Sequence, residues 1–199
     1  MNGKRIGRVS CAGAAARRAW HYSRRAAALW IVVLALLLAP ATARPQSDFT
    51  RQVEARVFAL VNDLRGEHGL KPLEREARLD DATSYFAGYI AGTGNLDHRA
   101  DGSTPAMRVK QRGYAYCVLS ENIAYEYSSR GFTPEGLARN FVEGWRDSPT
   151  HRANILDSRV TETGLGVARN AAGEYYAVQL FGRPPIAGAK KGAACPRRG

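Results

Sequence analysis

The sequence predicts an α+β domain in which helices pack on a small, mostly antiparallel sheet. Three observations lead to this fold class. Helical periodicity dominates the first half of the chain, one apolar strand lies between helices, and two strands over 163–169 and 174–181 close the domain as a hairpin. With 45 % hydrophobic and 24 % charged residues, the composition is that of a globular protein.

Two long helices are expected at the start of the domain. From Asp48 to Leu64, apolar residues recur every three or four positions with polar residues on the opposite side, and the glycines that follow should end this helix. The same spacing predicts a second helix over 78–91. A polar loop containing His98 follows it.

Shorter elements should follow this loop. Pro105 marks the first turn of a short helix, and the apolar segment 118–124 predicts a strand. Another amphipathic helix is expected over 136–146. Ser148 is then a helix N-cap, because Pro149 occupies the first position of a further short helix.

The formal net charge of +11 is concentrated at the two ends of the chain. Residues 1–43 hold seven basic residues and no acidic one, and residues 183–199 hold five basic residues and no acidic one. The segment 44–182 has 17 basic and 18 acidic residues. This near-neutral body argues against a nucleic-acid-binding domain, which needs a basic surface. The basic tail would give only weak, salt-sensitive contacts with anionic polymers or lipid headgroups.

Residues 1–43 have the order of a secretory signal. A basic stretch precedes an apolar run over 26–39, and the small residues of Ala41-Thr42-Ala43 follow. The run is shorter than the roughly 20 residues that a membrane span needs. We therefore predict a signal peptide (1–43), a folded domain (44–182) and a basic tail rich in proline, glycine and alanine (183–199). Cleavage would leave no stable transmembrane anchor and a secreted or periplasmic protein, and an uncleaved anchor is the alternative.

Export changes the interpretation of the cysteines. Removal of residues 1–43 leaves Cys117 and Cys195, and in an oxidising compartment a lone pair most simply forms a disulfide. Such a bond would tie the tail back to the domain. Two unpaired thiols are the alternative.

Three residues stand out as candidates for chemistry. Glu121 interrupts an apolar strand, so its carboxylate is either exposed at an edge or buried and paired. Together with His98 and His151, it would form a nitrogen–nitrogen–oxygen set suited to Zn²⁺ with an open position. A hydrogen-bonded polar cluster without a metal is the alternative. The sequence contains no G-x-S-x-G, H-E-x-x-H or P-loop motif.

Several motifs resemble those of the CAP superfamily (cysteine-rich secretory proteins, antigen 5 and pathogenesis-related proteins), also called the SCP domain. They follow the family's order and include Asn62-Asp63-Leu64-Arg65, Gly69-Leu70-Lys71-Pro72-Leu73, His98, Ser120-Glu121-Asn122-Ile123-Ala124, the block from Trp145 to Leu156, Gly164-Leu165-Gly166-Val167 and the segment from Tyr175 to Phe181. The resemblance covers roughly residues 49–182 and is strongest to the bacterial secreted branch. It implies a three-layer α-β-α sandwich with a cleft.

In eukaryotic members that cleft is lined by two histidines and two glutamates that can bind a divalent metal. By position, His98 and Glu121 match the first histidine and the first glutamate. Ser148 and Tyr176 stand where the family has the second glutamate and the second histidine, so the full set is absent. The hypothesis is that His151 supplies the second imidazole, as in bacterial members. These five residues are therefore the predicted cleft lining, and His98, Glu121 and His151 the predicted ligands of a metal such as zinc.

The resulting functional prediction is a non-catalytic binding module outside the cytoplasm. Its cleft would hold a divalent metal, or a lipid or other cell-envelope ligand. The alternative is a metal-dependent hydrolase of the peptidase type. In that reaction Glu121 would act as general base or metal ligand, and a metal-bound water would be the nucleophile.

Overall fold

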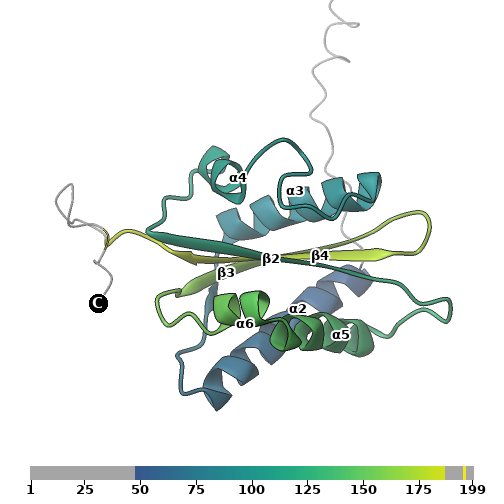
Figure 1. Ribbon diagram of the computed structural model, residues 1–199, viewed down its shortest axis with the longest axis horizontal. Coiled ribbons are helices and arrows are strands. Elements are labelled where there is room, and N and C mark those ends of the chain that lie inside the picture. Colours follow the sequence, from purple (N-terminus) through teal and green to yellow (C-terminus); the bar gives the residue numbers. More distant parts are fainter. Residues whose placement is uncertain (1–47, 187–194, 196–199) are drawn as a thin grey trace, which may run out of the picture. The chain divides into compact units, whose positions relative to one another are not determined.

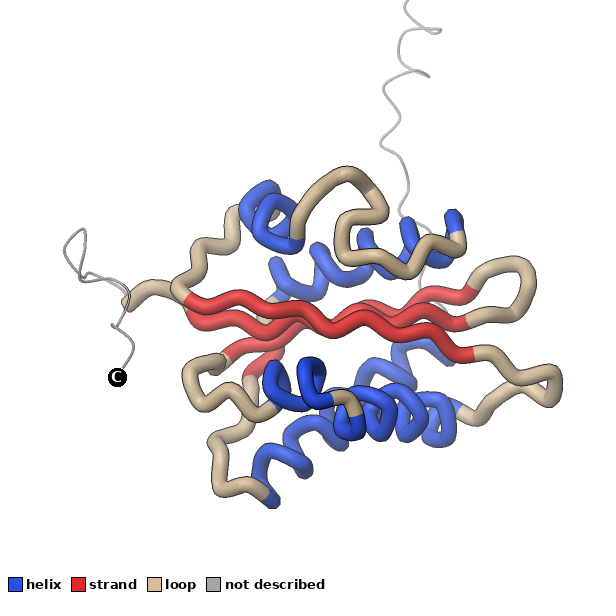
Figure 2. Tube along the Cα trace, viewed as in Figure 1, coloured by secondary structure: helices blue, strands red, loops and turns tan. Residues whose placement is uncertain are grey.

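A computed structural model describes residues 48–186 and Cys195. The predicted signal peptide and most of the predicted tail lie outside these residues. The described chain forms three layers, with a four-stranded sheet between two layers of helices (Figures 1 and 2). This confirms the predicted fold class. In chain order the elements are α2 (Asp48–Glu67), β1 (Glu74–Arg75), α3 (Ala77–Thr93), α4 (Pro105–Gln111), β2 (Val118–Glu126), α5 (Pro134–Asp147), α6 (Pro149–Ile155), β3 (Glu162–Arg169) and β4 (Tyr175–Arg183).

The sheet has the strand order β1-β3-β4-β2, so the long strand β2 lies at one edge. β4 pairs antiparallel with both β2 and β3, whereas the short β1 pairs parallel with β3. Glu121 on β2 lies opposite Leu180, and Asn122 lies opposite Gln179. Because successive side chains of a strand point to opposite faces, Glu121 and Asn122 face different helical layers.

Apolar side chains fill the space on both faces of the sheet. On one face, α2 and α5 contribute the largest cluster, which includes the buried Trp145 of α5. On the other face, α3 packs so closely on β3 that a Cβ atom at Gly164 or Gly166 would lie within 2.4 Å of α3 backbone. The absence of side chains at these two positions is therefore what allows α3 to lie against the sheet.

The helix ends agree with the sequence except at Ser148. Thr104 caps α4 and Thr133 caps α5, in each case through a side-chain oxygen that accepts a backbone N–H hydrogen bond. Ser148 does occupy the N-cap position of α6, but its side chain makes no capping hydrogen bond. The predicted N-cap position is confirmed, and the missing side-chain hydrogen bond is the one difference. Ser148 is the single residue between α5 and α6, so its backbone must end one helix and begin the next.

The structure confirms the disulfide between Cys117 and Cys195, with 5.2 Å between their Cα atoms. The backbone N–H of Cys117 also donates to the carbonyl of Arg183, at 2.7 Å, where β2 and β4 meet. Cys195 is therefore fixed beside the start of β2. Among residues 48–186 and Cys195, no helix is long and apolar enough to cross a lipid bilayer.

Candidate functional site

His98 belongs to the loop that joins α3 to α4. Helix α3 ends at Gly94, whose positive φ of 69° lets the chain turn sharply and whose N–H donates to the carbonyl of Ile90. The carboxylate of Asp97 then accepts a hydrogen bond from the backbone N–H of Arg99, at 2.7 Å. These local bonds shape the loop and place His98 at the edge strand β2.

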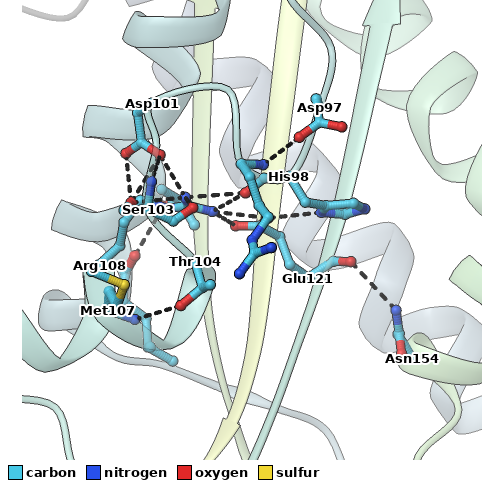
Figure 3. Close-up of polar contacts among 12 residues, drawn as sticks. Asp97, His98, Asp101, Ser103, Thr104, Met107, Arg108, Glu121 and Asn154 are labelled. Carbon is cyan, nitrogen blue, oxygen red and sulfur yellow. Dashed lines mark hydrogen bonds and ion pairs between the residues drawn. The ribbon is translucent and has the colours of Figure 1, made fainter.

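His98 and Glu121 form the centre of the site (Figure 3). Nδ1 of His98 lies 2.8 Å from Oε1 of Glu121. The glutamate side chain is only 2 % exposed, whereas 48 % of the histidine side chain is exposed. The hydrogen bond to Glu121 raises the pKa of His98, with partial burial opposing it. Because Nδ1 is engaged, Nε2 is the ring nitrogen left for another partner.

Arg108 of α4 holds the other side of the Glu121 carboxylate. Its Nη2 lies 3.0 Å from Oε1 and 2.8 Å from Oε2 of Glu121, and its Nη1 lies 3.1 Å from Oδ1 of Asp101. The same guanidinium donates to the backbone carbonyl of His98. Its central carbon lies 3.5 Å from the centroid of the Phe86 ring. A buried arginine thus links the loop, the edge strand and α3.

On the opposite side of β2, two asparagines link the strand to α6 through hydrogen bonds. Nδ2 of Asn122 donates to the backbone carbonyl of His151 at 3.1 Å. Asn154 donates to Oδ1 of Asn122 at 2.8 Å and to the backbone carbonyl of Glu121 at 3.5 Å. The last of these bonds is drawn in Figure 3. The segment around His151 is therefore held at β2 through its backbone.

The half-buried imidazole of His151 lies close enough to His98 for the two charges to interact. Burial lowers the pKa of His151, and the positive charge of His98 lowers it further. His98 is held at β2 through the Glu121 side chain, and His151 through its backbone carbonyl, which accepts from Asn122.

The two remaining predicted cleft residues have other roles. Tyr176 is 3 % exposed and packs in the apolar cluster under α3. Its hydroxyl lies 3.1 Å from Oε2 of Glu174 in the closing hairpin, so Tyr176 is a core residue rather than a lining residue of an open site. Ser148 is half-buried at the junction of α5 and α6.

The predicted metal set does not come together as three ligands. Within the described residues, no three His, Cys, Asp or Glu side chains form a group that could hold a metal ion. His98 and Glu121 are hydrogen-bonded to each other, and the second oxygen of Glu121 accepts from Arg108. The residues present therefore do not fit a metal that Glu121 would ligate.

Arg108 and Asp101 are the parts of the site that sequence reasoning missed. Arg108 stands in an amphipathic segment between Met107 and Val109, where an arginine is ordinarily a surface residue. The sequence contains one indication of Arg108: a buried Glu121 needs a cationic partner, although the sequence does not say which residue provides it.

The comparison with protein families decides the classification. The model of the cysteine-rich secretory protein family, CAP, matches residues 58–181, which is more than half of the chain. The chain belongs to the CAP family. Among similar proteins, YkwD from Bacillus subtilis is 29 % identical over 152 residues, covering 73 % of this chain and 55 % of YkwD. The chain therefore spans about half the length of that relative.

Solved structures share the CAP fold with this chain. An outer surface protein from Borrelia burgdorferi superposes with a TM-score of 0.60 at 18 % identity, over 71 % of this chain and 99 % of that one. The structure of NaASP2 with Zn²⁺ superposes with a TM-score of 0.51 at 14 % identity, over 70 % and 84 % of the respective chains. At these identities the likeness shows the fold.

Proposed function

We propose that this CAP protein is an exported, non-catalytic binding module whose site lies along the edge strand β2, around His98 and His151. The ligand class is a lipid or another cell-envelope component. Three observations support export: the signal-like order of residues 1–43, the disulfide, and the likeness to a protein described as an outer surface protein. Disulfides persist chiefly in oxidising compartments outside the cytoplasm.

The state of the Glu121 carboxylate carries the argument against a hydrolase. A general base must lie within about 3 Å of the proton that it removes. Both oxygens of Glu121 already accept hydrogen bonds from Arg108 and His98, and the side chain is almost completely buried. A carboxylate that is paired with a buried arginine and almost completely buried is poorly placed to activate a water molecule. Its role is to hold His98.

A histidine that is oriented by a carboxylate also occurs in hydrolases with a serine or cysteine nucleophile. In those enzymes a hydroxyl or thiol lies within hydrogen-bond distance of the other ring nitrogen. In the part of the chain that the structure describes, the ring of His98 is hydrogen-bonded to a carboxylate and to no hydroxyl or thiol. This favours a histidine that presents a hydrogen-bonding nitrogen to a ligand.

The function can be tested on the protein purified from an exported fraction. Native mass spectrometry would detect a bound lipid or envelope component, and hydrolysis of a peptide mixture would be followed with and without a chelator. We expect a bound ligand that His98→Ala weakens, while His68→Ala at the end of α2 retains it, and no turnover. Chelator-sensitive peptide hydrolysis that Glu121→Gln abolishes would overturn the proposal.

A further inference from the structure

We infer that Arg108 supplies, from within the chain, the positive charge that a divalent cation supplies in a metal site, so that the His98–Glu121 pair is built without a metal. The observation behind this inference is the disagreement between the metal site that the family resemblance implied and the donors that the structure provides. The inference concerns how the site is held together, and it is independent of which ligand the site binds.

The Glu121 carboxylate is held by the head group of Arg108. The guanidinium approaches both carboxylate oxygens, at 3.0 Å and 2.8 Å from Nη2, and Nη1 contacts Asp101 at 3.1 Å. Arginine is suited to this arrangement because its planar head presents several N–H donors in a fixed orientation. Three hydrogen bonds therefore occupy most of the roughly four lone-pair sites of the Glu121 carboxylate, two at Oε1 and one at Oε2.

The ion pairs of Arg108 are buried. The Arg108 side chain is 0 % exposed, and the two carboxylates that it contacts are each 2 % exposed. The ring of Phe86 covers the guanidinium at 3.5 Å. Because a buried, paired charge leaves its position only at a large energetic cost, Arg108 cannot swing aside to admit a metal. A dication placed at Glu121 would lie next to a fixed positive charge and be repelled.

Arg108 positions His98 as well as Glu121. Its two terminal nitrogens each lie 3.2 Å from the backbone carbonyl of His98, and Nη1 also contacts the carbonyl of Ser103 at 3.3 Å. These bonds fix the loop that carries the histidine. Arg108 is therefore a positioning residue, which sets the place of the imidazole through the backbone and its orientation through Glu121.

The test is a zinc titration of the untagged, chelator-treated full chain. NMR signals of the His98 and His151 rings and the thermal unfolding midpoint are recorded before and after adding one equivalent of Zn²⁺. We expect ring signals and midpoint to be unchanged by chelator and by zinc. A saturable shift of both rings at one equivalent, lost in Glu121→Gln, would overturn the inference, as would a crystal structure showing zinc on Glu121 with Arg108 displaced.

A matched pair of variants tests the role of the charge itself. Arg108→Met keeps much of the length of the side chain without the charge, and Arg112→Met removes a neighbouring arginine that does not contact Glu121. We expect a folded Arg108→Met variant to bind Zn²⁺ at least ten-fold more tightly than the parent, and Arg112→Met to match the parent. Equal zinc affinity in the parent and a folded Arg108→Met variant would contradict the inference. If that variant does not fold, the titration of the parent chain decides.

Discussion

Replacing Gly166 with alanine should destabilise this protein by about 2–3 kcal/mol, because α3 lies directly on β3 at this point. An added Cβ atom would lie 2.4 Å from the carbonyl carbon of Thr83 and 2.5 Å from the backbone nitrogen of Ser84. Carbon atoms in ordinary contact are about 3.5–4.0 Å apart. The atoms that must move are helix backbone, so the whole of α3 has to shift outward by about 1 Å.

The same substitution at Gly144 is the matched control. Gly144 lies in α5, and an added Cβ atom there would have no neighbour within 4 Å. Alanine is favoured over glycine inside a helix, so Gly144→Ala should stabilise the protein by about 0.5–1 kcal/mol. One chemical change is thus expected to have opposite signs at the two positions.

Urea unfolding of the oxidised variants measures both effects. Gly166→Ala should lower the unfolding midpoint at an unchanged slope, and it should lower the melting temperature by roughly 6–12 °C. Gly144→Ala should raise both. If Gly166→Ala proved as stable as the parent chain, the distance between α3 and β3 would not be set by this contact, and the packing argument would fail.

Three further predictions follow from the site and its surroundings. In an NMR pH titration, the pKa of His98 should lie above the ordinary value of 6.5 and that of His151 below it. The stabilisation that His98 contributes is complete below pH 6.5 and is lost as the pH rises through its raised pKa. A pKa of His151 above that of His98 would contradict the site geometry. Asn154→Ala leaves the buried side-chain oxygen of Asn122 without its donor and should lower the free energy of unfolding in urea by about 1–3 kcal/mol. The control Asn140→Ala, at an exposed position, should lower it by less than about 0.5 kcal/mol. Equal losses in the two variants would refute this prediction. Reducing the disulfide should lower the free energy of unfolding by about 2–4 kcal/mol, and an unchanged urea midpoint after reduction would rule this out.

The helices and long strands could be predicted from sequence because their buried sides repeat with a clear period. Val53, Val57 and Val61 form one buried face of α2, and the spacing alone identifies them. Strand β1 could not be predicted, because two residues, Glu74 and Arg75, show no alternation. Its parallel pairing with β3 depends on where the rest of the chain brings it.

The candidate site was predictable only in part. The proximity of His98 to Glu121 followed from the family resemblance, and a buried Glu121 required a cationic partner. That the partner is Arg108 depends on how α4 packs over Phe86 and β2, and such tertiary burial leaves no periodic signal. Tyr176 was assigned to the cleft by position in the family pattern. It is on the same face of the sheet as Glu121, but it pairs with Tyr125, four residues further along β2, and is buried in the apolar cluster under α3.

The disulfide also divides the chain into a closed ring, residues 117–195, and an open segment before it. Glu121 and His151 both belong to the ring, so the covalent structure limits their separation even when the oxidised chain unfolds. His98 and Arg108 belong to the open segment and have no such limit. Of the two ion pairs of Arg108, the one with Glu121 therefore joins the open segment to the ring, whereas the one with Asp101 lies within the open segment.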